Sequence, residues 1–523
     1  MRIELMGIVK NKLDYLLSLD PSNLPIEYRA HAASIDQIRT RCSKEGTPDK
    51  EKKEEFIEEV AYTWFNRLIA LRFMDVNGIS DTMSVSPLPD QTIPQLFNEA
   101  KAGTIPSDLK IDTAKFFDLI DKKIAAKDPD NEAYRMLFIA VCNHYYDAMP
   151  FMFEKISDYT ELLLPDDLLS PNSVRAKVVA AMPQEDCTDI EIIGWLYQFY
   201  ISEKKDNVFE ALKKNKKITP SNIPAATQLF TPHWIVKYMV ENSLGKLWLQ
   251  NRPTSKLKDH MKYYIESDEQ NDFIKVTTPE ELTLLDPCCG SGHVLTYAFD
   301  LLTKIYEEEG YTSSEIPALI LQNNLYGCDI DKRAATLAQF ALMMKARQYH
   351  KRFLRKKIRP NVVELQEFGS DTFKGIKNFG SLLKGDSGES FGEGVFAQGN
   401  KEYELQTRVL SGTFHCVVTN PPYMGGKGMN KELGDYVKSR YPDSKSDLFA
   451  VFMERTLELT KPKGYMSMIN QHSWMFLSSY EKLRHKIIKD HKIDTMVHLG
   501  PRAFEEIGGE VVQSVAFVLE KGE

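Results

Sequence analysis

Apolar residues recur at helical spacing through the first 220 residues of the chain. The clearest case is residues 53–78, where apolar side chains fall at positions i, i+1, i+4 and i+5 and therefore share one face of a helix. Two aromatic stripes, at residues 137–146 and 194–202, are typical of buried helix faces rather than of ligand sites. The pattern predicts an all-α N-terminal domain over residues 1–220, with a boundary near Pro220.

After this boundary, short apolar runs ending in Asp, Asn or Gly alternate with helical segments. This alternation is typical of a parallel α/β sheet. Residues 221–523 are therefore expected to form an α/β domain, interrupted at 374–410 by a flexible insertion that holds seven glycines. The predicted strands number seven and lie at residues 282–287, 324–331, 361–371, 413–420, 464–470, 494–500 and 510–520.

Composition narrows the class of protein. The chain has 523 residues, of which 42% are hydrophobic and 27% charged, so we expect a multidomain globular protein. Its net charge of -8 confines any nucleic-acid contact to local basic patches. There is no export signal at the start and no apolar run long enough to span a membrane, which predicts a cytoplasmic location. The seven cysteines form no CxxC pair, so we expect neither a metal site nor disulfides.

A glycine-containing loop, Asp286-Pro287-Cys288-Cys289-Gly290-Ser291-Gly292, separates the first predicted strand from the helix that follows. Such a turn lets the backbone approach a ligand closely at the carboxyl edge of a sheet. The third glycine of a dinucleotide fingerprint is absent, which argues against a pyrophosphate site. Taken alone, the loop is equally compatible with a tight structural turn.

Acidic residues follow the next two predicted strands. Asp329 ends the second strand, where a carboxylate can accept hydrogen bonds from two ribose hydroxyls. Asp331 is the expected N-cap of the following helix. Asp371 follows the third strand, where it either accepts from an adenine amino group or caps its own loop.

Upstream of these strands, Thr231-Pro232 has the features of a helix start. We expect Thr231 to be the N-cap, Pro232 to occupy the first turn and Gly245 to end the helix. The alternative is that Thr231 reaches the carboxylate of a cofactor.

The sequence Asn420-Pro421-Pro422-Tyr423 ends the fourth predicted strand. An exocyclic amine on an aromatic base is a poor nucleophile, because its lone pair is delocalised into the ring. Two acceptors, the Asn420 side-chain oxygen and the Pro421 carbonyl, would favour a pyramidal nitrogen and free that lone pair. The prolines stiffen the loop, and Tyr423 offers a ring for stacking. An activated sulfonium methyl donor would then need mainly in-line placement and exclusion of water.

Together these segments resemble the amino-group DNA methyltransferases of the gamma arrangement, in which the Thr-Pro helix precedes the cofactor loop and Asn-Pro-Pro-Tyr follows it. This resemblance covers residues 220–523 and implies a Rossmann-like class I SAM-dependent methyltransferase fold that uses S-adenosylmethionine. Four segments of the sequence resemble the PglX family of adenine-specific methyltransferases, found in bacteriophage exclusion (BREX) defence systems. They are residues 61–78, 194–202, 228–245 and 285–295.

The resemblance also implies roles for individual residues. Asp329 would bind the ribose of the cofactor and Asp371 its adenine. A flipped target adenine would be held by Asn420, Pro421, Pro422 and Tyr423, with Phe504 stacking on the other face of the base. Lys427 and Lys431 are placed for contacts with DNA phosphates. The residues expected to line the cofactor site are Thr231, Asp286, Pro287, Cys288, Gly290, Gly292, Asp329, Asp371 and Thr372.

Relatives of this family continue past the seventh strand into a long target-recognition region, whereas this sequence stops at Glu523. The expected partners are therefore double-stranded DNA, a target-recognition region absent from this chain or a separate specificity protein, and other defence proteins. Two alternatives stay open. The chain could be a protein-glutamine methyltransferase, since Asn-Pro-Pro-Tyr can also polarise an amide nitrogen, or a cofactor-binding but non-catalytic platform for DNA or a partner.

Overall fold

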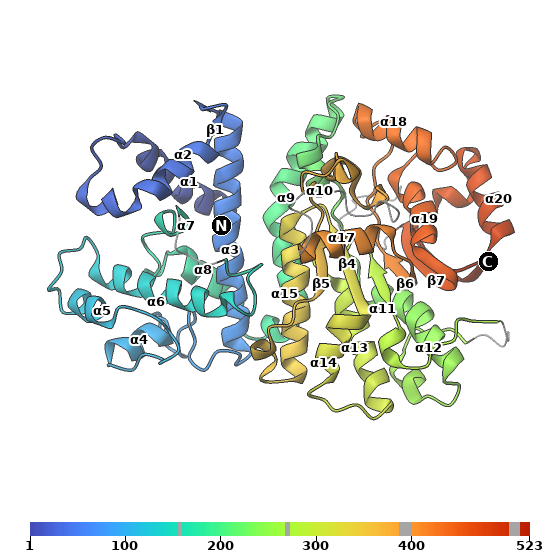
Figure 1. Cartoon of the computed structure of the whole chain (residues 1–523), viewed down its shortest axis with the longest axis horizontal. Coiled ribbons are helices and arrows are strands. Elements are labelled where there is room, and N and C mark those ends of the chain that lie inside the picture. Colours follow the sequence, from blue (N-terminus) through green and yellow to red (C-terminus); the bar gives the residue numbers. More distant parts are fainter. Residues whose placement is uncertain (155–158, 267–271, 386–399, 502–512) are drawn as a thin grey trace. The chain divides into compact units, whose positions relative to one another are not determined.

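The computed structural model describes residues 1–154, 159–266, 272–385, 400–501 and 513–523 (Figure 1). The chain divides into two compact units, Met1–Ile192 and Ile193–Glu523. Among the described residues, no helix combines the length and the apolar character needed to cross a lipid bilayer.

The first unit is built from helices, as the apolar spacing predicts. Its central helix, α3 (Lys50–Val76), buries Trp64, whose ring lies 6.1 Å from that of Phe138 in α6. A hairpin of two short strands, β1 (Ser43–Lys44) and β2 (Thr47–Pro48), precedes α3. The other helices are α1 (Arg2–Ser18), α2 (Ala32–Arg41), α4 (Gln95–Lys101), α5 (Thr113–Ile120), α6 (Pro129–Tyr146), α7 (Tyr159–Leu162) and α8 (Val174–Ala181).

The second unit contains a seven-stranded sheet, and each of the seven predicted runs supplies one strand. The strand order is β5-β4-β3-β6-β7-β9-β8. The four pairs from β5 to β7 are parallel, whereas β9 runs antiparallel to both of its neighbours. The bounds are β3 (Leu284–Asp286), β4 (Leu325–Asp329), β5 (Asn361–Glu364), β6 (Phe414–Thr419), β7 (Thr460–Gln471), β8 (His491–Gly500) and β9 (Ser514–Lys521).

The expectation of a parallel sheet is therefore wrong for β9, which lies between β7 and β8 and pairs antiparallel with both. The apolar runs predict where strands lie, but the direction of a strand is set by its pairing with segments distant in the sequence. The seven-stranded α/β fold itself is confirmed.

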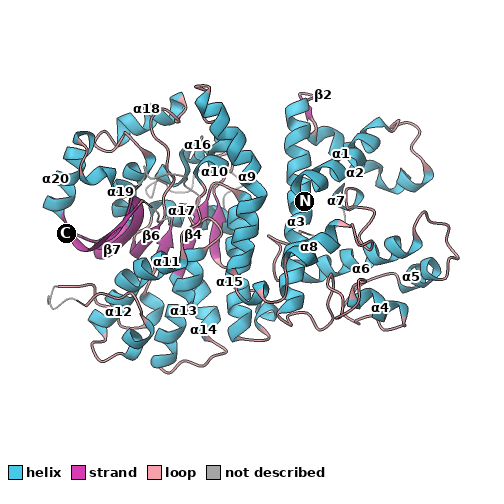
Figure 2. Cartoon of the chain, turned by 180° about the vertical axis from the view of Figure 1, so that it is seen from behind, coloured by secondary structure: helices cyan, strands magenta, loops and turns pink. Residues whose placement is uncertain are grey.

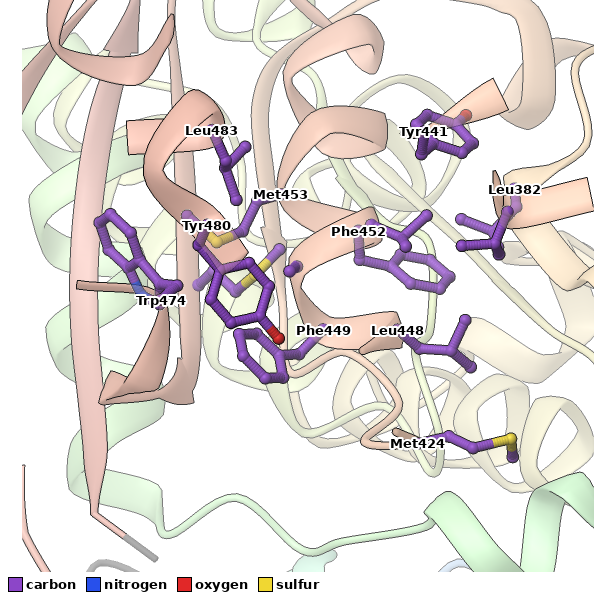
Figure 3. Close-up of a cluster of buried hydrophobic side chains, with 14 of the residues drawn as sticks. Leu382, Met424, Tyr441, Leu448, Phe449, Phe452, Met453, Trp474, Tyr480 and Leu483 are labelled. Atoms are coloured by element: carbon purple, nitrogen blue, oxygen red, sulfur yellow. The ribbon is translucent and has the colours of Figure 1, made fainter. Parts of the chain in front are cut away.

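Helices cover both faces of the sheet (Figure 2). Helices α11 and α13 pack on one face and α17, α19 and α20 on the other. Figure 3 shows the apolar core on the second face, where Phe449 and Met453 of α19 meet Trp474 and Tyr480. The helices are α9 (Glu191–Lys213), α10 (Ile223–Thr227), α11 (His233–Val240), α12 (Lys246–Asn251), α13 (His293–Glu308), α14 (Ile316–Leu319), α15 (Lys332–Tyr349), α16 (Ile376–Phe379), α17 (Lys401–Ser411), α18 (Lys431–Arg440), α19 (Leu448–Leu459) and α20 (Glu481–Asp490).

The boundary between the units lies at Ile192/Ile193, well before the expected position near Pro220. Helix α9 accounts for the difference, because nearly all of it belongs to the sheet-containing unit. The hydroxyl of its Tyr197 hydrogen-bonds to the Asp331 carboxylate at the start of α15. Apolar spacing identifies α9 as a helix, but it does not reveal which core the helix packs against.

Two smaller expectations are also corrected. Gly245 does not end the helix that follows Thr231, because a π-helical turn at Glu241–Gly245 leads directly into α12. A side chain at Gly245 would come within 2.3 Å of the Met261 sulfur, so this glycine serves close packing. Both ends of the expected flexible insertion 374–410 contain helices, α16 and α17, whereas its residues 386–399 lie outside the described part of the chain.

Candidate active site

Two neighbouring cavities lie where strands β3, β4 and β6 end. The first encloses about 800 Å³ of empty space, part of it open to solvent, and its wall includes Asp329, Ile330, Leu382 and Phe452. The second is smaller and is lined by more polar side chains. The two cavities share five lining residues, which are Gln228, Leu229, Cys288, Gly290 and Asn420. These shared residues join the predicted cofactor loop to the predicted catalytic loop.

The cofactor loop is held at the end of β3 by the buried Asp286. Its carboxylate accepts hydrogen bonds from the Thr419 hydroxyl at 2.7 Å and from the backbone N–H of Cys288 at 3.1 Å. Burial raises the pKa of Asp286 to about 7. Asp286 lines the second cavity, so a hydrogen-bond acceptor whose charge changes with pH lies in the wall of that cavity.

The two glycines of the loop have different tasks, although both adopt positive φ. A side chain at Gly292 would meet the Ala338 backbone at 3.0 Å, so Gly292 lets α13 pack tightly against α15. A side chain at Gly290 would have no protein atom within 4 Å. Gly290 lines both cavities, so its missing side chain leaves room for a ligand to cross from one cavity to the other.

Asp329 ends β4 and faces the first cavity, as predicted. Its two carboxylate oxygens accept from the backbone N–H groups of Gly290 at 3.0 Å and Asp331 at 2.8 Å. Burial raises the pKa of Asp329 to about 6. Asp331 caps α15 as expected, because its side chain accepts from the Arg333 N–H. The two acids two residues apart thus have different surroundings and different tasks.

Asn420 lies at the junction of the two cavities. Its side-chain N–H donates to the Thr231 hydroxyl at 3.0 Å, and its side-chain oxygen accepts from the Tyr423 hydroxyl at 2.9 Å. The Tyr423 hydroxyl also lies 2.9 Å from the Ile469 carbonyl at the end of β7. These contacts fix the orientation of the amide, and they leave the second lone pair of its oxygen available.

The other members of the Asn-Pro-Pro-Tyr sequence are placed differently. Pro422 lines the first cavity, while Pro421 is buried. The ring of Tyr423 packs beside Phe449, with ring centroids 6.2 Å apart. Burial raises the pKa of the Tyr423 hydroxyl well above its usual value. Tyr423 is thus a neutral side chain that supports Asn420, with one part of its ring in the core.

Thr231 is not the N-cap, because α11 begins at His233 and Pro232 precedes it. An N-cap side chain must accept from an N–H of the first helical turn. The Thr231 hydroxyl instead accepts from Asn420 and lines the second cavity. The interpretation of Thr231 as a plain cap is therefore wrong.

Several predicted site residues do not line either cavity. Asp371 is exposed at the start of a 3-10 turn (Asp371–Phe373), and the neighbouring Thr372 is half-buried. Lys427 and Lys431 are exposed beyond the catalytic loop. Phe504 lies outside the described residues.

Other residues line the cavities although the sequence did not single them out. Phe379 and Gly380, from the expected insertion, contribute to the first cavity. Gln198, Gln228 and His293 contribute to the second. The sequence does offer one indication for Gln198, because it is a polar residue within the aromatic stripe at 194–202.

The arrangement fits a ligand with a nucleoside at one end and a polar group at the other. Ile330, Phe379 and Leu382 offer apolar walls for a base, and Asp329 offers acceptors for ribose hydroxyls. Figure 3 shows Leu382, Leu448 and Phe452 converging, and all three line the first cavity. The open position at Gly290 connects this apolar cavity with the polar one.

Comparison with known proteins shows what the chain is similar to. A family model described as Eco57I restriction-modification methylase matches residues 323–504. The chain is 40% identical over 89% of its length to adenine-specific methyltransferase BrxX of Escherichia coli O9:H4 (strain HS). It is 39% identical, again over 89% of its length, to adenine-specific methyltransferase PglX of Lacticaseibacillus casei (strain Zhang).

In each of these two relatives the match covers 44% of the full length, so the chain spans somewhat less than half of either protein. Among solved structures, the Type IIL restriction-modification enzyme MmeI in complex with DNA is 14% identical. That alignment covers 89% of this chain and 55% of MmeI, with a TM-score of 0.47.

The sheet order, the loop after β3 and the family match agree on one fold. It is the Rossmann-like fold of class I SAM-dependent methyltransferases, and S-adenosylmethionine is the cofactor that this fold and family imply. Over 89% of its length the chain is similar to the adenine-specific methyltransferases BrxX and PglX, as the sequence resemblance predicts.

Proposed function

We propose that this chain is the catalytic part of a DNA adenine-N6 methyltransferase that transfers the methyl group of S-adenosylmethionine to an adenine in duplex DNA. The observation that carries the proposal is the position of Asn420. Its amide lies at the junction of the two cavities and is held in place by Thr231 and Tyr423.

The chemistry required of the protein is modest. S-adenosylmethionine, when bound, supplies a methyl group on a positively charged sulfur, which is already activated. The Asn420 oxygen and the Pro421 carbonyl would accept hydrogen bonds from the amino group of the base and make its nitrogen lone pair available. Because the Asn420 amide is already fixed by two hydrogen bonds, little reorganisation is needed when the base arrives.

The target adenine must leave the base stack to reach a site at the edge of the sheet. We infer that it stacks on Tyr423 and, from the other side, on Phe504. Lys427 and Lys431 would contact the DNA backbone, where each lysine adds affinity without reading sequence. Sequence recognition would come from a region or partner outside this chain. The biological role would be phage defence of the BREX type, by analogy with the PglX family.

The test is to map N6-methyladenine in host DNA by single-molecule sequencing, with the native chain and with Asn420→Ala. We expect the mark to fall by about a hundred- to a thousand-fold, the range seen when one preorganised transition-state hydrogen bond is removed. Affinity for S-adenosylmethionine should change by less than about threefold, since the proposal assigns the Asn420 amide to the target base and not to the cofactor.

Three outcomes distinguish the alternatives. Methylation that persists in the Asn420→Ala variant would contradict the proposed mechanism. Methylation of a protein glutamine by the native chain, with no mark on DNA, would support the protein methyltransferase. Tight cofactor binding with no methylation of either substrate would support a non-catalytic platform.

A further inference from the structure

Helix α9 approaches the cofactor loop unusually closely at Gly194. A side chain there would come within 2.6 Å of the His293 ring and 2.8 Å of the Ser291 hydroxyl. Real side chains do not tolerate contacts this short, so glycine is what allows α9 to lie against the loop. The hydrogen bond from Tyr197 to Asp331, one turn further along, fixes the helix in this position.

Residues i and i+4 share a face of a helix, so Gln198 follows Gly194 on the face that meets the cofactor loop. Gln198 is 8% exposed and lines the second cavity. Both its amide oxygen and its amide nitrogen are buried, and neither has a hydrogen-bond partner among the described residues. The same holds for the side-chain oxygen of Gln228, which lines this cavity too.

A buried amide without partners is unfavourable, because it gives up its hydrogen bonds with water and gains none in return. Proteins generally satisfy such groups, and exceptions call for an explanation, such as binding to a ligand. Here the unpartnered amide lies beside Asp286, Thr231 and Gly290, which are the residues that surround the predicted cofactor. Gln198 therefore has the position and the free hydrogen-bonding capacity to contact the end of the cofactor that reaches the second cavity.

The chemistry of the cavity identifies that end. The nucleoside fits the apolar first cavity, and the methyl-bearing sulfur must lie near Asn420 at the junction. The amino-acid end then falls in the second cavity, where Asp286 can accept from its ammonium group. Among the residues that line this cavity in the described part of the chain, none is lysine or arginine. The side chains there that can donate to the cofactor's carboxylate are therefore the amides, the hydroxyls and the imidazole of His293.

We propose that Gln198, from the helix that precedes the methyltransferase fold in sequence, donates a hydrogen bond from its amide nitrogen to the carboxylate of S-adenosylmethionine. This rests on the proposed cofactor site, and it adds a ligand contact from α9. Gly194 and Gln198 then act together. Gly194 lets α9 lie against the cofactor loop, and Gln198 contacts the cofactor.

The experiment measures binding of three compounds to the whole chain by calorimetry. S-adenosylmethionine has both the carboxylate and the ammonium group, decarboxylated S-adenosylmethionine lacks the carboxylate, and 5′-methylthioadenosine lacks the entire amino-acid portion. We expect Gln198→Leu, whose side chain is similar in size but cannot donate a hydrogen bond, to weaken the binding of S-adenosylmethionine at least tenfold. Binding of the other two compounds should change less than twofold.

The control is Asn207→Ala, which removes an exposed amide from the same helix and should leave all three affinities unchanged. Retained binding of 5′-methylthioadenosine shows that the Gln198→Leu variant is folded.

The proposal would be overturned if the variant bound all three compounds equally less tightly, or if it bound all three as tightly as the native chain does. If the native chain binds S-adenosylmethionine but methylates no DNA, the assignment of Gln198 can still stand while the proposed function fails. If the native chain binds none of the three compounds, both fail.

Discussion

The two cavities differ in how their polar groups are satisfied. In the first, Asp329 already receives two backbone hydrogen bonds, so its carboxylate is rigidly aimed before any ligand binds. In the second, the amide of Gln198 keeps unused hydrogen-bonding capacity. The first cavity thus offers a ligand a carboxylate whose position is fixed before binding. The second cavity offers an amide that gains its hydrogen-bond partners only when a ligand binds.

The largest effect is expected at Asp286, which faces the second cavity. Because burial raises its pKa from 3.8 to about 7, the folded state binds more protons than the unfolded state between these values. The free energy of unfolding should therefore fall as the pH rises from about 4 to about 7, by up to about 4 kcal/mol. Asp286→Asn removes the titrating group. We expect it to raise the free energy of unfolding at pH 8 and to flatten this pH dependence, as measured by chemical denaturation.

The same variant should bind S-adenosylmethionine less tightly, because a neutral amide attracts an ammonium group less than a carboxylate does. A variant that is more stable and yet binds less tightly would show that the fold carries a buried acid for the sake of its ligand. If Asp286→Asn were less stable at pH 8, burial would not be what dominates the environment of Asp286.

An intermediate effect is expected at Asp329. Asp329→Asn keeps the shape of the side chain but removes the charge, and hydrogen bonds to charged groups contribute about 1.5–3 kcal/mol. We expect affinity to fall about tenfold or more for both S-adenosylmethionine and 5′-methylthioadenosine, because both contain the ribose. This common loss contrasts with Gln198→Leu, which should spare 5′-methylthioadenosine. A loss for S-adenosylmethionine alone would contradict the assignment of Asp329 to the ribose.

The smallest effect is expected at Gly194. The change Gly194→Ala improves helix propensity by about 1 kcal/mol but introduces a clash with His293 and Ser291. We expect little net change in the melting temperature, because the two terms oppose each other. Affinity for S-adenosylmethionine should fall about three- to tenfold, since Gln198 is displaced by part of an ångström.

Gly434→Ala in α18 is the matched control, because a side chain there would have nothing within 4 Å. It should raise the melting temperature and leave cofactor affinity unchanged. Equal cofactor affinities in the two alanine variants would show that α9 does not depend on its glycine to reach the loop.

The sequence predicted those parts of the site that follow from local rules. Asp286, Asp329 and Asn420 stand at the ends of apolar runs, and the carboxyl ends of parallel strands meet at one edge. The seven strands were predictable for the same reason, although the direction of β9 was not. Each of these features depends on residues that are close together in the chain.

Features that depend on distant contacts were not predictable. Thr231 has the local sequence of an N-cap, yet its hydroxyl meets Asn420, 189 residues further along. Gly245 resembles a helix stop because nothing nearby in sequence reveals Met261 against it. The unit to which α9 belongs is likewise not evident from its aromatic stripe, because it depends on a tertiary contact between Tyr197 and Asp331.

The hydrogen bond between Tyr197 and Asp331 has a practical consequence for anyone who trims this protein. A shortened chain that begins at residue 221, where the strand pattern starts, would keep every strand of the sheet. It would nevertheless lose α9, and with it one wall of the polar cavity. Such a fragment could fold and still bind its cofactor poorly, so an independent catalytic fragment should begin before α9.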